Sequence, residues 1–430
     1  MTNNIYEVPI VLLYLHEHRV NDLKSWLKSL EKFAQLDVTI IASNSTINNL
    51  DMLLATKHRF SIENIEEGRS NCDEVLNQHS AKLLWIEFKR FYSRFKFLYS
   101  KSLQFLADKK DAVLVTYDDR ISSLIPILKA SHKKGIPVFL PAILTTRPDV
   151  TGTTSNTLKP KRKIETVIAC IAKCFFPHHI NHEGRLFYTP LSYLVLLMFN
   201  ALPKRPWIKG TLTYTNKLGV ESRLAFEKLL ESGVHEDKLE LTGMPVYDLM
   251  DFSREDDSVN NMLLCALPQY GEHGAMNVEE AIPIVEEILL ALTEFSGKVV
   301  ISLHPRMSPV TYQPIVEKYG FECVVGNIDS LLKKTSLFVA ASSSTTIYSS
   351  LIMGIPTIAL NHIYPGSNVF RDLESITYIE QDASEIVVAI QEPKPDLEEL
   401  LKKDQQLLSS SLVTDGKCGE RNLNVIQSLL

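Results

Sequence analysis

Short apolar segments alternate along this chain with polar loops and with stretches of helical period. In the first half, apolar runs at Pro9 to Leu15, Val38 to Ile41, Ala112 to Thr116 and Ile136 to Leu140 each end in a polar loop or a turn. An amphipathic segment from Asp22 to Ala34 follows the first of them. Strand, loop and helix in alternation predict a parallel, doubly wound α/β sheet.

The same alternation returns after residue 260 and predicts a second sheet of this kind. Met262 to Leu267 and Leu337 to Ala341 read as buried strands, a β-branched run starts at Val299, and Val278 to Phe295 has the period of a helix. A polar stretch, DFSREDDSVNN at 251–261, separates the halves. We therefore expect domains at 1–250 and 260–395 and a helical tail at 396–430.

Two other segments of the first half predict further helices and strands. Cys72 to Lys109 contains no proline or glycine and predicts one long helix or two consecutive ones. The segment TLTYT, Thr211 to Thr215, predicts a strand, followed by a helix at Gly219 to Glu231 and a further strand at Leu239 to Thr242.

An insertion at about 150–210 joins short apolar runs to many cations. Basic residues around a short apolar helix suit an interfacial membrane anchor, because the apolar face enters the headgroup boundary while the cations meet anionic lipid. The alternative is a pair of buried helices with solvated lysines at their ends. The cations of residues 159–209 are Lys159, Lys161, Arg162, Lys163, Lys173, Arg185, Lys204, Arg205 and Lys209.

Composition narrows the class of protein. A net charge of −6 over 430 residues gives no support to a general nucleic-acid binder. The six cysteines form no CxxC pair and show no zinc-like spacing with histidine, which favours a reducing, cytoplasmic compartment. No secretory signal is evident, and the longest apolar run, Leu191 to Leu202, is too short to span a bilayer. We expect a cytoplasmic protein, peripheral at the inner face of the membrane if the insertion is an anchor.

Two strands of the second half end in residues suited to phosphate. A helix start presents unpaired N–H groups, and an imidazole and a guanidinium add charge-assisted donors. Because parallel strands deliver their loops to one edge, we expect a nucleotide-phosphate clamp there. The alternatives are serines that only cap a helix and a His-Pro that only turns the chain. The clamp comprises His304, Pro305, Arg306, Ser342, Ser343, Ser344 and Thr345, with a subsidiary part for Gly271, Glu272 and His273.

The candidate base lies in the first half. Asp118 and Asp119 follow the strand Ala112 to Thr116, and either carboxylate is a candidate to take the proton of an acceptor hydroxyl. Asp119 is preferred, because it lies further into the loop, which leaves Asp118 to cap the next helix. An acidic helix N-cap without catalysis is the alternative. The acceptor side is expected to include His16, His18 and Arg120.

Two segments resemble the GT-B superfamily of nucleotide-sugar glycosyltransferases and non-hydrolysing UDP-N-acetylglucosamine 2-epimerases. GVHEDKLELTGMPVYDLM, 233–250, is similar to its interdomain passage, and SSSTTIYSSLIMGIPTIAL, 342–360, is similar to its donor-nucleotide region. The resemblance implies two Rossmann-like, doubly wound domains facing a cleft, with the acceptor on the N-terminal side and the nucleotide donor on the C-terminal side.

Within this superfamily the chain departs from the epimerases. They carry a glutamate after the strand equivalent to Ile136 to Leu140 and paired glutamates after the phosphate loop. Here those positions hold Pro141-Ala142-Ile143, and Tyr348 and Ser349. The His-Pro and Ser-Ser/Thr motifs are instead similar to bacterial sialyltransferase-type enzymes, which use CMP-activated ulosonic acids. Those enzymes pair the motifs with an Asp/Glu-Asp/Glu-Gly motif, whereas Asp118-Asp119 precedes Arg120.

The resemblance implies a GT-B glycosyltransferase of bacterial surface-polysaccharide or lipid-linked glycan synthesis. A CMP-ulosonic acid is preferred over a UDP- or GDP-sugar as donor. The expected mechanism is an inverting single displacement without metal or cofactor, in which His304 assists the leaving phosphate. The alternatives are a nucleotide-sugar 2-epimerase, a polyol-phosphate transferase and a non-catalytic scaffold of glycan assembly.

Overall fold

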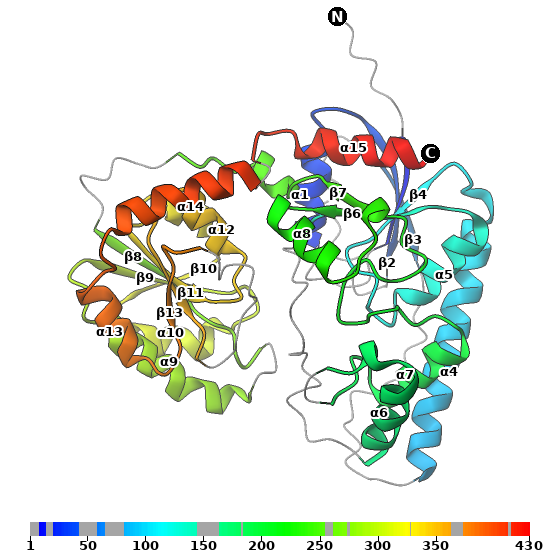
Figure 1. Ribbon diagram of the computed structural model, residues 1–430, viewed down its shortest axis with the longest axis horizontal. Coiled ribbons are helices and arrows are strands. Elements are labelled where there is room, and N and C mark those ends of the chain that lie inside the picture. Colours follow the sequence, from blue (N-terminus) through cyan, green and yellow to red (C-terminus); the bar gives the residue numbers. More distant parts are fainter. Residues whose placement is uncertain are drawn as a thin grey trace, which may run out of the picture. The chain divides into compact units, whose positions relative to one another are not determined.

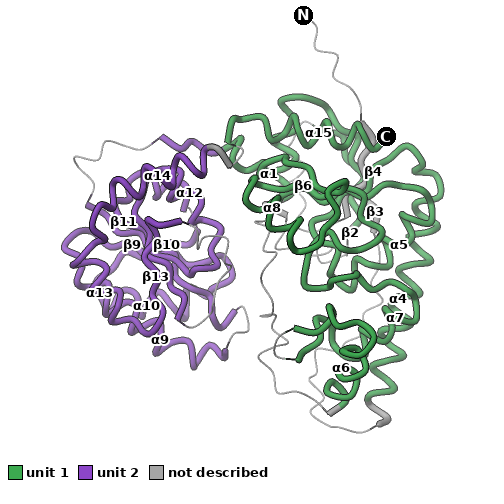
Figure 2. Tube along the Cα trace, in the orientation of Figure 1, with its two compact units in different colours: residues 1–152, 160–249, 412–430 green, residues 153–159, 250–411 purple. Residues whose placement is uncertain are grey.

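The structure of the chain is a computed structural model. It describes residues 8–13, 20–42, 58–64, 81–143, 163–181, 184–253, 261–272, 276–326, 328–362, 373–411 and 414–430. The chain forms two compact units, the first made of 1–152, 160–249 and 412–430 and the second of 153–159 and 250–411 (Figure 2). The predicted tail, 396–430, is thus divided between them.

A seven-stranded sheet forms the centre of the first unit, and all its neighbouring strands are parallel (Figure 1). Its order is β3-β2-β1-β4-β5-β6-β7. The central strands β4 and β5 are buried along their whole length, as their unbroken apolar sequences require. The strands are β1 Val8–Leu13, β2 Leu36–Ala42, β3 Arg59–Asn64, β4 Val113–Val115, β5 Val138–Leu140, β6 Lys217–Val220 and β7 Leu239–Leu241.

Helices pack on this sheet through apolar stripes. In α1 (Val20–Leu30) the side chains of Leu23, Trp26, Leu27 and Leu30 recur every three or four residues and are fully buried. The predicted helix within Cys72 to Lys109 is a single helix, α4, followed by a 3-10 turn at Leu106–Asp108; residues 72–80 lie outside the described part. Apart from α1 and the two helices of the insertion, the helices that the structure describes in this unit are α4 Ala81–Phe105, α5 Ile125–Lys134, α8 Arg223–Glu231 and α15 Cys418–Leu429.

The insertion contributes two helices to the first unit. They are α6 (Lys163–Phe175) and α7 (Pro190–Met198), which contact each other, and α7 also packs against α4 (Figure 1). In α7 the side chains of Leu191, Val195 and Leu196 are buried. In α6 only one face is buried, so the description as a pair of buried helices fits α7 alone.

The strand predicted at Thr211 to Thr215 is wrong. These residues form a turn, and the strand that pairs with β5 is β6, Lys217–Val220. The turn forms because backbone N–H groups of this segment donate to the Asp119 carboxylate instead of to a neighbouring strand. Gly219 then enables close packing within the sheet, since a Cβ there would lie 2.7 Å from Thr242 Oγ1.

The second unit contains a six-stranded parallel sheet of order β10-β9-β8-β11-β12-β13. Its strands are β8 Met262–Ala266, β9 Lys298–Leu303, β10 Glu322–Val325, β11 Leu337–Ala341, β12 Thr357–Leu360 and β13 Thr377–Ile379. Its helices are α9 Val278–Leu292, α10 Pro309–Lys318, α11 Ile328–Leu332, α12 Thr346–Ile352, α13 Ser384–Gln391 and α14 Leu397–Ser411.

Local sequence signals set the ends of two of these helices. Asn277 and Glu280 form a reciprocal capping box at the start of α9. Gly354 ends α12 with φ +68°, a left-handed conformation that favours glycine, and Pro356 follows it before β12. Two parallel, doubly wound sheets confirm the fold class predicted from the sequence.

Candidate functional site

The strand order locates the crevice of the second sheet. Its order reverses between β8 and β11, and ligands of such sheets bind beyond the carboxyl ends of the strands at this switch point. The segments that leave these two strands are 267–272 and 342–345. They include the predicted Gly271, Glu272 and hydroxyl run; His273 lies outside the described residues.

Ser342 needs a correction as a phosphate ligand. Its side chain is buried, and its Oγ donates to Asn361 Oδ1 at 2.7 Å. Asn361 Nδ2 in turn donates to Glu380 Oε2 at 2.7 Å, so hydrogen bonds connect the segments that follow β11, β12 and β13. The Ser342 hydroxyl therefore holds the loop in place, because its proton is already used inside the protein.

The rest of the hydroxyl run leads into α12. Ser343, Ser344 and Thr345 are half-buried, and Ser344 Oγ lies 2.5 Å from Thr346 Oγ1. The helix begins at Thr346, whose N–H donates to Ser344 Oγ at 3.4 Å. The three hydroxyl residues are thus in the connection between strand and helix, with part of their surface accessible.

His304, Pro305 and Arg306 turn the chain directly after β9. The Met307 N–H donates to the His304 carbonyl at 2.8 Å, and the Arg306 N–H donates to His304 Nδ1 at 3.1 Å. Because Nδ1 accepts a hydrogen bond, the neutral imidazole carries its proton on Nε2. The turn interpretation is therefore right for the backbone, and it also fixes Nε2 as a hydrogen-bond donor.

Several buried polar atoms at this edge have no protein partner among the described residues. They are Gln269 Oε1, Tyr270 Oη and Glu272 Oε2 after β8, and His362 Nδ1 after β12. Burial lowers the pKa of His362, against the opposing effect of the Asp382 and Glu385 carboxylates. Buried polar groups are nearly always paired in folded proteins, so unpaired ones in segments that follow strands at one edge of the sheet indicate a polar ligand.

Sequence reasoning missed Gln269, Asn361 and His362. The rule that selected His304 and the hydroxyl run selects residues that follow a strand. Applied to the strand Thr357–Leu360, it would have pointed to Asn361 and His362, which come directly after it.

The first sheet has its own switch point, between β1 and β4. The segment after β1 contains His16 and His18 and lies outside the described residues. The segment after β4 contains Asp118, Asp119 and Arg120, so the topology assigns the predicted acidic pair to the expected edge.

Asp119 does not have the accessible position predicted for it. Its side chain is completely buried, and its carboxylate accepts hydrogen bonds from Gly210 N, Leu212 N and Thr215 Oγ1 at 2.9 to 3.2 Å. Burial, together with the Asp118 charge, raises the pKa of Asp119. The helix-cap alternative is also wrong, because α5 begins only at Ile125 with Leu124 as its N-cap.

Asp118 retains limited exposure, 14% of its side chain, and pairs with Arg120. The guanidinium donates twice, through Nη2 to Oδ2 at 2.7 Å and through Nε to Oδ1 at 3.0 Å. Burial alone would raise the pKa of Asp118, but the charge and hydrogen bonds of Arg120 lower it overall. Asp118 is therefore ionised at neutral pH and is the more exposed carboxylate of the two.

Other buried polar groups surround this pair. Among the described residues, Thr116 Oγ1 and Tyr188 Oη have no hydrogen-bond partner. Lys209 is buried, and its Nζ lies 3.5 Å from the Pro141 carbonyl; burial lowers its pKa, against the effect of the Asp118 and Asp119 carboxylates. Neither Tyr188 nor Lys209 follows a strand directly, so no sequence signal placed these two residues beside the acidic pair.

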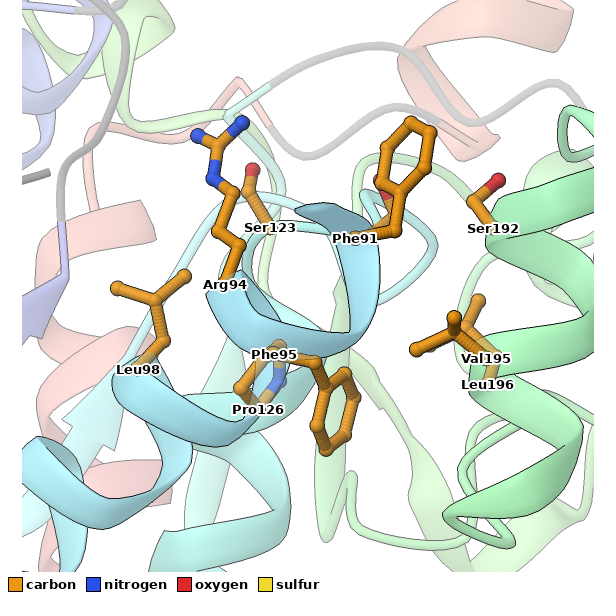
Figure 3. A pocket seen from close by; sticks show the side chains of 10 residues that line it. Phe91, Arg94, Phe95, Leu98, Ser123, Pro126, Ser192, Val195 and Leu196 are labelled. Carbon is orange, nitrogen blue, oxygen red and sulfur yellow. The ribbon is translucent and has the colours of Figure 1, made fainter. Parts of the chain in front are cut away.

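A pocket of mainly apolar lining lies in the first unit, between α4, α7 and the turn before α5 (Figure 3). Phe91 and Phe95 of α4 lie on the side toward Val195 and Leu196 of α7, and Leu98 of α4 also lines the pocket. Polar side chains complete the lining: Ser122, Ser123, Ser192 and Arg94. No residue predicted as catalytic or nucleotide-binding lines this pocket, although Ser122 follows Arg120 by two positions.

No protein-family model and no curated protein matches this chain. Solved structures do. The calicheamicin glycosyltransferase CalG4 aligns with a TM-score of 0.59 and 12% identity over 99% of both chains. Arabidopsis thaliana UGT89C1 complexed with UDP aligns with a TM-score of 0.56 and 12% identity over 98% of this chain and 99% of that one.

A third solved structure has a different activity. The Neisseria meningitidis UDP-GlcNAc 2-epimerase bound to UDP-GlcNAc aligns with a TM-score of 0.52 and 12% identity, over 98% of this chain and 99% of that one. Likeness at this identity concerns the fold and leaves the reaction open. The chain has the GT-B fold that glycosyltransferases and UDP-N-acetylglucosamine 2-epimerases share.

Proposed function

We propose that this chain is a glycosyltransferase that takes a sugar from a nucleotide-activated donor bound to its second unit. The supporting observation is the carboxyl edge of the second sheet. There, unpaired buried atoms of Gln269, Glu272 and His362 accompany a hydroxyl loop and the Nε2 donor of His304. Hydroxyl and N–H donors suit phosphate oxygens, and buried acceptors suit the hydroxyl and amino groups of a sugar or a base.

The proposed donor is a CMP-ulosonic acid, with a UDP- or GDP-sugar as the alternative. The pairing of His304-Pro305 with Ser343 and Ser344 supports this preference. In α12, where the epimerases carry paired glutamates, Tyr348 and Ser349 are buried. Neither side chain has a carboxylate, so these two positions do not bind the ribose in the way that the epimerase glutamates do.

Asp118 is the proposed base, in place of Asp119. The acceptor oxygen forms a bond to the anomeric carbon while the bond from that carbon to the phosphate breaks. Asp118 takes the hydroxyl proton, and the phosphate leaves with the electron pair, stabilised by His304 and Arg306. Asp119 is a positioning residue, since it fixes the turn at 210–215. An inverting, metal-independent course remains part of this proposal.

The acceptor is proposed to be a glycan of bacterial surface polysaccharide or a lipid-linked glycan, bound by the first unit. The apolar walls of the pocket between α4 and α7 support an acceptor with an apolar portion, and Arg94 adds a cation to its lining. Ser122 connects this pocket in sequence to the Asp118–Arg120 pair.

A 2-epimerase is the second candidate, favoured by the fold shared with the Neisseria meningitidis enzyme. The two reactions differ in their need for an acceptor. An epimerase converts its nucleotide sugar alone, whereas a transferase releases free nucleotide at a rate that rises with acceptor. Nucleotide binding without either reaction would indicate the scaffold alternative.

Thermal denaturation with CMP, CDP, UDP and GDP tests the donor site, because a ligand that binds the folded state raises the melting temperature. We expect the largest shift from CMP and its loss in Arg306→Ala. Lys402→Ala, which removes an exposed cation of α14, is the matched control and should keep the shift. If none of the nucleotides raises the melting temperature of the wild-type chain, the proposed donor site is wrong.

A further inference from the structure

One face of α6 is apolar and exposed. Val167, Ile171 and Phe175 recur every four residues and therefore lie on one side of the helix. Their side chains are 58%, 55% and 73% exposed. Cys170 and Cys174 beside them are exposed as well. We call these five residues the outer face of α6.

The opposite face of α6 already anchors the helix. Ile168, Ala169 and Ala172 are buried in the core of the first unit. Figure 1 shows α6 and α7 beside α4 in this unit. The outer face is thus an addition to a packed helix, and its apolar side chains contribute little to the stability of the fold. A stripe of large apolar side chains left in water indicates a binding surface.

The positive charge of the segment that contains α6 indicates which kind of partner the outer face would bind. Residues 159–209 contain nine lysines and arginines against two glutamates, in a chain whose net charge is −6, and of these cations Lys209 is buried. Lys173 is an exposed residue of α6 itself. Lys204 is exposed too, and its backbone bonds the ring of His179, which stacks on Phe176 just after the helix. Cations near an apolar stripe complement anionic lipid headgroups.

We propose that the outer face of α6 inserts into the headgroup region of an anionic bilayer. Among the residues that the structure describes, no helix is long and apolar enough to cross a membrane. With 13 residues, α6 is about 20 Å long, against a hydrocarbon core of roughly 30 Å, so it lies along the interface. This inference concerns where the protein resides and does not rest on the transfer reaction.

Vesicle sedimentation tests the proposal. The full chain is mixed with vesicles of phosphatidylcholine alone or with about one third phosphatidylglycerol, at low and high salt. We expect binding to the anionic vesicles, weakened by salt. The double variant Ile171→Ser/Phe175→Ser should bind about tenfold more weakly at both salt concentrations, because the loss of apolar area does not depend on charge. Lys173→Glu/Lys204→Glu should bind about tenfold more weakly at low salt only.

A matched control distinguishes binding through this surface from nonspecific binding by any exposed apolar side chain. Leu290→Ser/Val310→Ser replaces two apolar side chains of the second unit that are 61% and 88% exposed, and should bind vesicles like the wild type. All variants should keep the wild-type melting temperature, since each replaced side chain is exposed. Equal binding by the wild type and the Ile171→Ser/Phe175→Ser variant would overturn the proposal. So would a wild-type dimer that this variant converts to a monomer, because the face would then belong to a second copy of the chain.

Discussion

Asp248 accepts a hydrogen bond from the backbone N–H of Gly419 at 2.8 Å, across 171 residues of chain. The same carboxylate accepts from the N–H of Cys418 at 3.0 Å and from Ser29 Oγ at 2.7 Å. It thereby satisfies the free N–H groups at the start of α15, where a negative charge also complements the helix dipole. The closing aspartate of the segment GVHEDKLELTGMPVYDLM thus attaches the C-terminal helix to the first unit.

Replacing this carboxylate should loosen α15. In Asp248→Ala two helix N–H groups and one hydroxyl lose a charged acceptor, at a cost of roughly 1.5 to 3 kcal/mol. Hydrogen exchange should show faster exchange of the amides of residues 418–429 than in the wild type. Asp251→Ala removes an exposed carboxylate that pairs with Lys333 and should leave this exchange unchanged. Unchanged protection in Asp248→Ala would mean that the packing of Trp26 and its hydrogen bond to Asn422 suffice to hold the helix.

The sequence was informative wherever a local pattern determines the structure. Apolar runs predicted both sheets because strands buried on two faces admit few polar residues, as β4 and β12 show. The segment Thr211 to Thr215 misled the prediction. Its alternating pattern suits a strand, but the buried Asp119 carboxylate accepts hydrogen bonds from the backbone N–H of Leu212, 93 positions later, and from the Thr215 hydroxyl, 96 positions later, and no local pattern encodes that partner.

The candidate sites divide in the same way. Residues that follow strands could be predicted, because parallel sheets deliver them to one edge. The exposure of Asp118 relative to Asp119 could not be predicted, because it depends on which of the two carboxylates bonds the turn at 210–215. Tyr188 reaches the same environment from the insertion, and only the tertiary structure brings it there.

Asp119→Asn should destabilise the first unit rather than abolish proton transfer directly. The amide group would put its own N–H donors against those of Gly210 and Leu212, so at least one buried donor loses its partner, at roughly 1 to 3 kcal/mol. We expect a lower melting temperature and faster amide exchange at 210–215. Asp118→Asn should leave exchange in this turn near the wild-type rate. If Asp119→Asn melts like the wild type, the positioning role is wrong.

The Asp118–Arg120 pair predicts a specific dependence of stability on pH. The pKa of Asp118 is lower in the folded chain than its ordinary value near 3.9, so the folded state favours the ionised form. The pair therefore stabilises the fold fully above about pH 5, and this contribution is lost as the pH falls through the folded pKa.

Melting temperatures of the wild type and Asp118→Asn should therefore differ by a constant amount from about pH 8 to 5 and converge below about pH 4. The difference at neutral pH should correspond to roughly 1.5 to 3 kcal/mol, because the variant leaves a half-buried guanidinium without its carboxylate. A difference that persists unchanged to pH 3 would show that the charge of Asp118 in its ion pair with Arg120 is not what stabilises the fold. Turnover by Asp118→Asn should fall by orders of magnitude if Asp118 is the base, since an amide cannot accept the proton.

The two nitrogens of His304 have separable roles, which paired substitutions can distinguish. Nδ1 accepts the Arg306 N–H and shapes the turn, while Nε2 is the proposed donor to the leaving phosphate. An asparagine side chain places its oxygen near the position of Nδ1 and offers no donor near that of Nε2. A glutamine side chain reaches further and can place an N–H near Nε2.

His304→Asn should therefore keep the melting temperature and lose about 10- to 100-fold in kcat/KM for the donor, corresponding to one charge-assisted hydrogen bond. His304→Gln should recover part of that loss. His235→Ala, at an exposed histidine of the first unit, controls for the removal of an imidazole and should retain full activity. Wild-type kcat/KM in His304→Asn would remove this imidazole from the leaving-group clamp and leave Arg306 with the hydroxyls of Ser343 and Ser344 as its remaining members.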